Sequence, residues 1–573
     1  MGSVTNAEGS TNTDLIVHNA KVTTLDEERR DATAFIVRGG KFAAIGADAE
    51  VLRQRTPSTR VVDAQGRRVI PGLNDNHLHG VRGGLQFNTE LRWDGVKSLR
   101  HGLQMIREQA KRTPQDQWVR VMGGWSPYQF EERRFPTVAE INEAGNGAKA
   151  LVLFAYSKAF LSEAARAAIS LAPTSKPEEG GRYEFMDNGA IVSGTPTIYK
   201  VLANLPSLPR ADQLNSTQRF LRELNRLGLT SFIDAGATGV AYPADYRAIA
   251  ELASRPRFPV RISNFLFAQK SGTELESFQS WTAQDPVGVN MAKNRLKGYV
   301  LEGGGEILVW DASDYEDFML PRPEWNAGVA KELRDVVNVL TEKHWPIRIH
   351  ASYDETISQI LDVFEPSFKA ARYKQRWAID HAETITPKNI ARIKALGGGI
   401  ALQSRLAFSG EFFIERYGEQ TAAMVQPVRA MLDMGVPVSA GTDATRVSSY
   451  NPWLSIYWMV TRRTLGGRQF GGAENVLSRE EALRLYTVGS AWLSNEEVVK
   501  GRIKRGQYAD FAILSDDYMT VPPERIRSIE SVLTMTGGDV VYAAVPFTEI
   551  PIAPLPAITP AWSPVAVFGG YQT

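Results

Sequence analysis

The sequence predicts an α/β protein with two parts: a (β/α)8 barrel, and a β-sandwich to which both ends of the chain contribute. Two patterns indicate this fold. Strand-like runs alternate with helical stretches through the middle of the chain, and short β-type runs recur at both ends. The length of 573 residues exceeds what one hydrophobic core usually fills, so more than one domain is expected.

Alternating strands and helices are typical of a parallel sheet with crossover helices, and eight strands are the number that closes a TIM-type barrel. The predicted barrel strands are residues 68–73, 230–234, 259–265, 295–301, 346–349, 377–380, 399–402 and 437–440. Helical periodicity at 217–227 and 328–343 supports the crossovers. Residues 91–216 do not fit the repeat. We interpret them as an insertion after the first strand of a barrel domain that spans 69–499.

Short strand-like runs also fill residues 15–69, where Asn19, Gly39-Gly40 and Gly46 interrupt them, and similar runs return at 501–514 and 531–542. Because these runs flank the barrel region on both sides, we predict that residues 15–68 and 500–573 fold together into one composite β-sandwich domain. Residues 1–14 are polar, show no signal-peptide pattern and are predicted to be a disordered tail.

The composition limits the possible partners. The 65 Lys and Arg residues balance 64 Asp and Glu residues, so no net charge attracts nucleic acid or an anionic membrane. No run of about eighteen apolar residues predicts a transmembrane helix. We therefore expect a cytoplasmic protein that acts on a small molecule. The chain has no cysteine, so any metal ion must be held by imidazole and carboxylate groups.

Candidate metal ligands stand at the ends of predicted barrel strands. His77 and His79 follow the first apolar run, and in an extended segment their side chains project to the same side. His350, His381 and Asp443 follow three later strands, so four of the seven histidines lie at strand ends. Each histidine alone is more typical of a structural role. Because active groups of such barrels gather at the carboxyl ends of the strands, the ordered set predicts one metal site. These ligands favour zinc, with iron or manganese as alternatives.

With these residues identified, the chain resembles the amidohydrolase superfamily, and within it amidohydrolase family 3, which includes N-substituted formamide deformylases. The resemblance covers roughly residues 15–542. It is carried by Pro71-Gly72, Asp75-Asn76-His77-Leu78-His79, His350, His381, Gly441-Thr442-Asp443 and the segment from Gly501 to Asp510. It implies a metal-dependent barrel flanked by a composite β-sandwich, a homodimer, and an enzyme that acts on carbon–nitrogen bonds other than peptide bonds.

One position departs from the family pattern. Many members of this branch carry a metal-bridging lysine four residues before an Asp-Gly pair on the fourth strand. The corresponding pair here is Glu302-Gly303, and Gly298 stands in place of the lysine. Lys297 is one position away and is expected on the other face of the strand. The sequence therefore favours one ion over two, with Glu302 or Glu306 as a substitute ligand or base.

The one-ion arrangement assigns roles to the remaining residues. The expected ligands are His77, His79, His350 and Asp443. His381 is expected to bond to the attacking water or to stabilise the oxyanion, and Asp443 is expected to act as general base. The predicted reaction is hydrolysis of an amide, formamide or cyclic amide C–N bond by a metal-activated water. Two alternatives stay open: a deaminase of a nitrogen heterocycle, and a metal-binding protein that kept this scaffold but lost turnover.

Three loop residues are predicted to contact the substrate. Trp125, Arg405 and Arg446 lie in segments that should open onto the same face of the barrel. The two arginines could clamp a substrate carboxylate, and ordinary ion pairing is the alternative for each of them.

Overall fold

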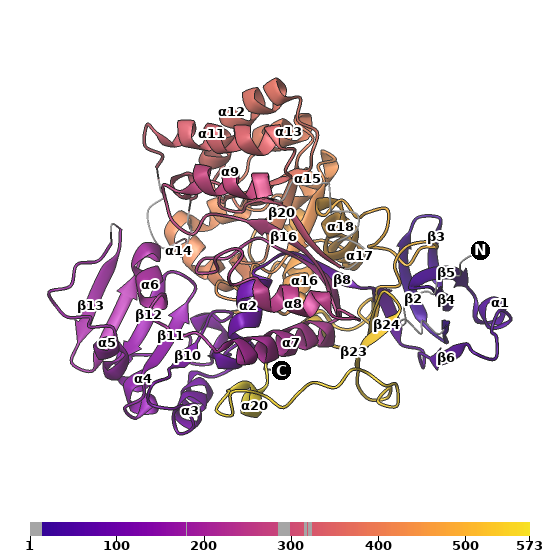
Figure 1. The fold of residues 1–573 in the computed structure, drawn as a ribbon, viewed down its shortest axis with the longest axis horizontal. Coiled ribbons are helices and arrows are strands. Elements are labelled where there is room, and N and C mark those ends of the chain that lie inside the picture. Colours follow the sequence, from indigo (N-terminus) through magenta and orange to yellow (C-terminus); the bar gives the residue numbers. More distant parts are fainter. Residues whose placement is uncertain (1–13, 179, 285–297, 315–317, 319–323, 573) are drawn as a thin grey trace, which may run out of the picture.

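The computed structural model of the protein describes residues 14–178, 180–284, 298–314, 318 and 324–572. At its centre lies a sheet of eight parallel strands in the order β21-β20-β19-β18-β17-β16-β15-β8 (Figure 1). The strands are β8 (Leu73–Leu78), β15 (Leu229–Asp234), β16 (Arg261–Leu266), β17 (Tyr299–Gly304), β18 (Ile347–Ala351), β19 (Trp377–His381), β20 (Gly399–Gln403) and β21 (Val438–Gly441). Beyond β21, a parallel bridge between Ala444 and Leu78 brings the chain back to β8. The predicted barrel is confirmed.

Burial of the strands on both faces explains their apolar composition. β15, β16, β18 and β19 are buried at every position, because side chains fill the barrel on one face and helices cover the other. The covering helices include α2 (Gly80–Gln86), α7 (Arg210–Arg226), α8 (Arg247–Ser254), α9 (Glu274–Gln284), α11 (Val329–Glu342), α12 (Asp354–Ala371), α13 (Pro387–Ala395), α14 (Leu406–Ala423), α15 (Val428–Asp433), α16 (Pro452–Thr461), α17 (Arg479–Arg484) and α18 (Ser490–Leu493). Helix α11 matches the predicted segment 328–343 to within one residue at each end, and α7 covers the predicted segment 217–227 except for residue 227.

The prediction for the first barrel strand was wrong. Residues Arg68–Pro71 form β7, which pairs with β2 and β22 outside the barrel, and the barrel strand β8 begins only at Leu73. A single apolar run therefore contains two strands that belong to two sheets, and hydrophobicity alone does not separate them. The fourth strand also differs: it ends at Gly304, three residues later than predicted, and residues 295–297 lie outside the described part of the chain.

The two ends of the chain meet in a sheet of order β24-β23-β22-β7-β2-β3, beside a second sheet of order β5-β4-β1-β6 (Figure 1, right). The first strands are β1 (Leu15–His18), β2 (Lys21–Asp26), β3 (Arg29–Ala32), β4 (Ala34–Arg38), β5 (Lys41–Gly46) and β6 (Arg60–Asp63). The last are β22 (Phe511–Leu514), β23 (Ser531–Thr536) and β24 (Asp539–Ala543). Residues 1–13 of the expected tail lie outside the described range.

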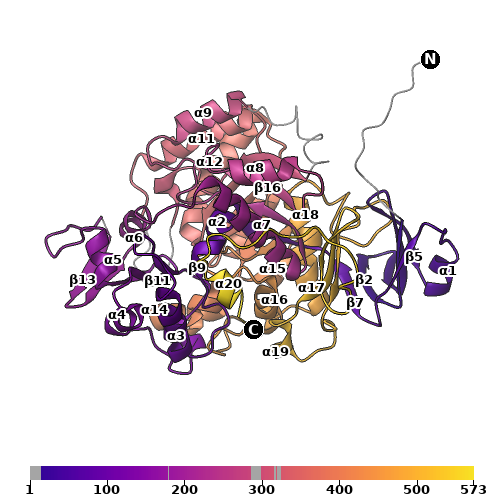
Figure 2. The ribbon, with the colours of Figure 1, turned by 60° about the horizontal axis from the view of Figure 1, so that its bottom comes forward.

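The segment between β8 and β15 carries a third structure, a six-stranded sheet of order β13-β14-β12-β11-β10-β9. Its strands are β9 (Glu90–Leu91), β10 (Val119–Val121), β11 (Ala150–Phe154), β12 (Lys158–Ser162), β13 (Arg182–Met186) and β14 (Gly189–Ser193). Its helices are α3 (Leu99–Ala110), α4 (Val138–Gly145), α5 (Glu163–Ala168) and α6 (Thr195–Leu202). This sheet lies at the end of the molecule opposite the sheets of the chain termini in both views (Figures 1 and 2).

Among the described residues, no helix is both long and apolar enough to cross a membrane. After β24 the chain runs back along α7 and the third sheet: the carbonyl of Ala557 accepts a hydrogen bond from Asn215, and that of Thr559 accepts one from Asn88.

Gly441 marks the seam where β21 meets β8. A Cβ atom at this position would lie 2.2 Å from Asn76 Oδ1 and 2.6 Å from the backbone nitrogen of His77. We expect Gly441→Ala to cost about 2–3 kcal/mol, because the two strands must separate to admit the methyl group. Thermal unfolding followed by circular dichroism would measure this loss. Gly145→Ala is the matched control, because its Cβ would meet Ala150 at an ordinary 3.4 Å. Equal melting temperatures for the two variants would contradict the tight seam.

Candidate metal centre

The structure brings together the five residues that the sequence predicted as a metal site. They lie at the carboxyl ends of β8, β18, β19 and β21, and all five are buried. His79 Nε2 lies 3.0 Å from Asp443 Oδ1, and His77 Nε2 lies 3.6 Å from the same oxygen. His381 and Asp443 both have left-handed backbones, with φ of 78° and 61°. Strained backbone of this kind is concentrated at functional sites.

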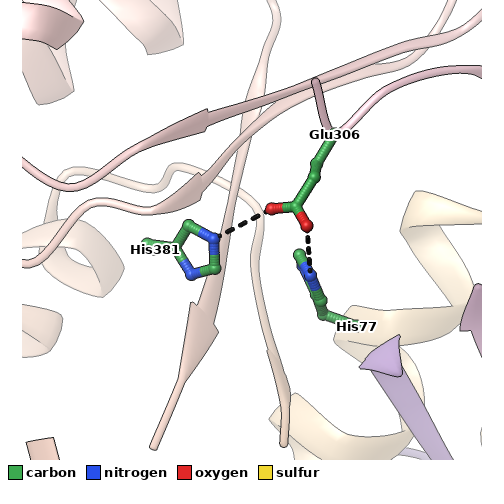
Figure 3. Close-up of side chains that lie close together, drawn as sticks. All are labelled: His77, Glu306 and His381. Carbon is green, nitrogen blue, oxygen red and sulfur yellow. Dashed lines mark hydrogen bonds and ion pairs between the residues drawn. The ribbon is translucent and has the colours of Figure 1, made fainter. Parts of the chain in front are cut away.

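Glu306 lies at the centre of this group. Its Oε1 atom is 3.4 Å from His77 Nε2 and 3.5 Å from His79 Nε2. Its Oε2 atom is 3.1 Å from both His350 Nδ1 and His381 Nε2. Figure 3 shows the two carboxylate oxygens directed toward His77 and His381. One carboxylate therefore contacts all four histidines.

The hydrogen bond of one ring nitrogen of His79 determines whether its other ring nitrogen can bind a cation. His79 Nδ1 is hydrogen-bonded to the carbonyl of Gly236, which can only accept, so Nδ1 carries the proton. Its Nε2 therefore directs a lone pair toward Glu306 and Asp443 unless that nitrogen is also protonated. A lone pair and an ionised carboxylate repel each other, so either a proton on Nε2 or a cation between the two groups must compensate.

His350 has carboxylates on both sides of its ring. Nε2 lies 3.3 Å from Asp314 Oδ1, while Nδ1 faces Glu306. Asp314 also accepts hydrogen bonds from the backbone N–H groups of Ser352 and Tyr353, at 2.8 to 2.9 Å. Asp314 is thus held in place by the backbone that follows β18, and it orients the His350 ring.

Beneath the site, Arg348 and Asp380 form a buried ion pair with Nη2 and Oδ1 2.5 Å apart. Arg348 Nη2 lies 3.2 Å from His77 Nδ1, and Asp380 Oδ2 lies 3.6 Å from the same nitrogen. Arg348 and His350 are two residues apart on β18, so both side chains point to the same side of the strand, into the barrel. The Arg348–Asp380 ion pair therefore contacts Nδ1 of His77 and fixes the position of the ring.

The two central carboxylates are kept ionised. Burial opposes ionisation of Glu306, but His77, His350 and His381 together lower its pKa well below the usual value. Burial likewise opposes ionisation of Asp443, and His77 and His79 lower its pKa. The site therefore carries concentrated negative charge at neutral pH.

The histidines respond to that charge in different ways. Burial favours neutral His77, but Glu306 and Asp380 raise its pKa to about 10. His350 is also buried, and Asp314 and Glu306 raise its pKa to about 9. Burial and Arg405 lower the pKa of His381 to about 3. The site thus attracts positive charge, which either protons on the rings or a divalent cation can supply.

The residues fit a divalent cation. Tetrahedral ligands about 2.0 Å from an ion lie roughly 3.3 Å from one another, and the nitrogen–oxygen separations around Glu306 and Asp443 are similar. His77 Nε2 is buried and has no hydrogen-bond partner among the described residues, as expected for a nitrogen reserved for an ion. In the part of the chain that the structure describes, two groups have ligand atoms close enough to share a cation: His77, Glu306 and His381, and His77, His79 and Asp443.

Glu302, predicted as a substitute ligand, lies outside this group. Its Oε1 atom accepts a hydrogen bond of 3.2 Å from Asn495. Because β17 continues to Gly304, Glu302 lies in the body of the strand, whereas Glu306 follows the strand end where the histidines gather. The sequence analysis placed the end of this strand three residues too early. Lys297 lies outside the described residues.

The predicted substrate-contact residues occupy three different environments. Trp125 is 1% exposed, donates to the carbonyl of Leu153 and stacks on Phe130, so it lies in the core of the third sheet rather than on a cavity wall. Arg405 lines the cavity beside the metal site, where its guanidinium donates to Glu383 Oε1 at 2.6 and 3.0 Å. Arg446 lies beside Tyr156, with Nη1 3.5 Å from its hydroxyl oxygen.

A cavity with about 820 Å³ of empty space opens onto the metal site. His79, Glu306, His350 and Asp443 line one part of it. The third sheet and α6 supply further walls, through residues that include Phe154, Tyr156 and Tyr199. Sequence analysis named none of these three aromatic residues, nor Asp314 and Arg82. Arg82 follows the His77–His79 motif without belonging to it, and the others stand in segments without a recognisable motif. Only folding brings Asp314 to His350 and the other residues to the cavity.

Three comparisons relate this fold and site to known proteins. The N-substituted formamide deformylase of Arthrobacter pascens is 26% identical over 543 residues, covering 92% of this chain and 98% of that enzyme. A metal-dependent hydrolase from Pyrococcus horikoshii superposes with a TM-score of 0.63 at 18% identity, over 89% of this chain and 99% of that one. Atrazine chlorohydrolase TrzN from Arthrobacter aurescens, complexed with zinc, superposes with a TM-score of 0.52 at 15% identity, over 92% and 95% of the two chains.

The family comparison covers most of the chain. The model described as "Amidohydrolase family" matches residues 60–542, a range that runs from β6 to β24 and contains the barrel, the third sheet and every residue of the candidate metal centre. The family predicted from the strand-end histidines and the closing Gly501–Asp510 segment is therefore confirmed, and the chain belongs to the amidohydrolase family.

Proposed function

We propose that the protein is a metal-dependent hydrolase that cleaves the C–N bond of a small amide, formamide or cyclic amide. The observation that carries this proposal is the Glu306 carboxylate surrounded by four histidines, with Asp443 beside it, at one end of a cavity that opens to solvent. The printed name of the relative from Arthrobacter pascens, an N-substituted formamide deformylase, supports the choice of bond.

The geometry favours two ions, whereas the sequence favoured one. Oε1 of Glu306 faces His77 and His79, and Oε2 faces His350 and His381, so the two oxygens can serve different ions. Asp443 would complete the first set. Glu306 would thereby take the bridging position that the lysine occupies in other members of the branch. Zinc suits this set of nitrogen and oxygen donors, and TrzN was crystallised with zinc.

When bound, divalent ions supply Lewis acidity, which polarises a carbonyl group and makes water a better nucleophile at neutral pH. Residues of the chain accept and donate the protons of the reaction. Asp443 lines the cavity and is held ionised, so it can accept a proton from the attacking water and pass it to the leaving nitrogen. His381 Nδ1 lies 3.9 Å from Asp443 Oδ2, which places the ring where it would orient the attacking water.

The test is turnover by zinc-loaded protein on a panel of N-substituted formamides, simple amides, cyclic amides and amino-substituted nitrogen heterocycles. Release of an amine together with formate or another carboxylate is the expected result. Release of ammonia from the heterocycles alone would instead identify a deaminase. Tight zinc binding without turnover of any compound would favour the metal-binding protein that lost activity. The predicted homodimer would be tested on the same sample by sedimentation.

Asp314→Asn is expected to weaken zinc binding by about 10- to 100-fold, because an amide neither carries the charge nor provides all the oxygen contacts that orient His350. Competition with a chelating dye would measure the affinity. Asp311→Asn, at an exposed position three residues earlier, is the matched control. Unchanged affinity in Asp314→Asn would show that His350 needs no support from this carboxylate.

A further inference from the structure

Two buried arginines meet at Tyr156: Arg82 lines the cavity at the metal site, and Arg446 lines a second cavity that shares Tyr199 and Thr238 with it. Arg82 follows the metal-site segment on α2, and Arg446 follows Asp443 after β21. Arg82 donates a 3.1 Å hydrogen bond to the hydroxyl of Tyr156, and Nη1 of Arg446 lies 3.5 Å from the same oxygen. Arg82 and Tyr156 line the cavity that contains Glu306 and Asp443. The Tyr156 hydroxyl therefore stands between two guanidinium groups close to the candidate metal centre.

The charges of these arginines are not neutralised within the described part of the protein. Arg82 is 2% exposed and Arg446 is 5% exposed, yet neither forms an ion pair with a described carboxylate. Glu90, a carboxylate that raises the pKa of Arg82, pairs with Arg92 at 2.6 Å. Asp234 accepts hydrogen bonds from the backbone N–H groups of Val81 and Gly236.

Both arginines also carry an N–H donor that no described residue uses. The Nε atoms of Arg82 and Arg446 are buried and have no hydrogen-bond partner among the described residues. Burial lowers the pKa of Arg82, and the nearby Arg446 lowers it further. Two buried cations side by side are costly unless an anion compensates them.

Arg405, the third arginine near the cavity, provides an internal contrast. Its guanidinium is already bound by Glu383 and donates to Ser352 Oγ at 2.9 Å. Its charge is therefore compensated by the protein itself. If an anionic group enters this cavity, the positive charge available to it lies at Arg82 and Arg446.

We propose that Arg82 and Arg446, together with the Tyr156 hydroxyl, bind a carboxylate of the substrate at a position separate from the C–N bond that is cleaved. Guanidinium groups offer paired N–H donors that match a carboxylate, and the tyrosine hydroxyl can donate a further hydrogen bond. The ring of Tyr199 packs edge-on against Tyr156 with centroids 5.0 Å apart and gives this part of the cavity an aromatic wall. That this carboxylate belongs to a substrate rests on the proposed function, whereas the binding of an anion at this position does not.

The experiment uses N-formylglycine, N-formyl-4-aminobutyrate and N-formyl-6-aminohexanoate, each beside its primary carboxamide. Affinities are measured by calorimetry on the zinc-loaded Asp443→Asn variant, in which turnover is expected to be slow, and formate release is measured on the otherwise unchanged enzyme. We expect the best carboxylate to bind about 10- to 100-fold more tightly than its carboxamide. Arg82→Gln or Arg446→Gln should remove this preference while changing the affinity for the carboxamide by less than about threefold.

Arg462→Gln is the matched control. Arg462 is also 2% exposed and has an unpartnered Nε, but it lies against Gln426 outside the cavity. The preference for the carboxylate should survive in this variant. If the arginine variants fold poorly, Tyr156→Phe keeps both charges and should reduce the preference by about threefold to tenfold.

The affinity measurements test the anion site, and the formate-release measurements test the proposed hydrolysis. Equal affinity for every carboxylate and its carboxamide, or an equal loss of both in Arg82→Gln, would overturn the anion site even if formate is released. A preference that depends on Arg82 without any formate release would retain the anion site and reject the proposed hydrolysis.

Discussion

Glu306→Gln is expected to lower kcat/KM by more than roughly a hundredfold and to reduce the bound zinc, because loss of an outer-shell partner alone costs up to about that factor. Glu306 contacts the two pairs of histidines through its two oxygens. An amide nitrogen in place of either oxygen would turn an N–H group toward imidazole nitrogens or toward an ion. Metal analysis after gel filtration and steady-state kinetics would measure both effects.

Glu302→Gln is the control for this prediction. Glu302 is a buried glutamate on β17, four residues before Glu306, and its carboxylate accepts a hydrogen bond from Asn495 instead of facing the histidines. Its replacement should leave zinc content and turnover close to those of the unchanged protein. If Glu302→Gln loses zinc and Glu306→Gln keeps it, Glu302 and not Glu306 is the metal ligand, which is one of the two substitutes that the sequence allowed.

Asp443→Asn is expected to lower kcat by about 10²- to 10⁴-fold, the usual contribution of a positioned general base. Asn cannot accept a proton at neutral pH, whereas Asp443 is held ionised by His77 and His79. The substitution preserves the shape of the side chain, so His77, His79 and Glu306 should retain zinc. The measurement is kcat under saturating substrate together with zinc content.

Asp433→Asn, at an exposed position ten residues earlier, controls for the chemical change itself. A kcat within tenfold of the unchanged enzyme in Asp443→Asn would exclude Asp443 as the base. Loss of zinc in parallel with kcat would instead assign it chiefly a ligand role.

The local pattern of the sequence was sufficient to predict most of the barrel strands and the histidines at their ends. Strands β15 and β18–β21 lie within about two residues of their predicted ranges, because buried parallel strands are short apolar runs bounded by polar or glycine residues. The histidines were found because a strand end is visible in sequence, and the barrel geometry places all strand ends on one face.

Two local features misled the sequence analysis. The apolar run at residues 68–73 contains parts of two strands, β7 and β8, and no breaker stronger than Pro71-Gly72 separates them. On β17 the glycine-rich sequence Gly303-Gly304-Gly305 reads as a turn, although the strand continues through Gly304. Glycine weakens strands but does not forbid them, so the boundary depended on pairing with β16.

The sequence by itself determined the barrel, the family and five polar residues at strand ends, since each follows from periodicity or from an ordered motif along the chain. Only the tertiary structure decided that Glu306 joins the four histidines, that Glu302 turns to Asn495, and that Arg82 and Arg446 both lie against the Tyr156 hydroxyl. The physical reason is that charge compensation and hydrogen bonding act through space. Residues from α2, the loop after β11 and the loop after β21 become neighbours only when β8 and β21 close the barrel.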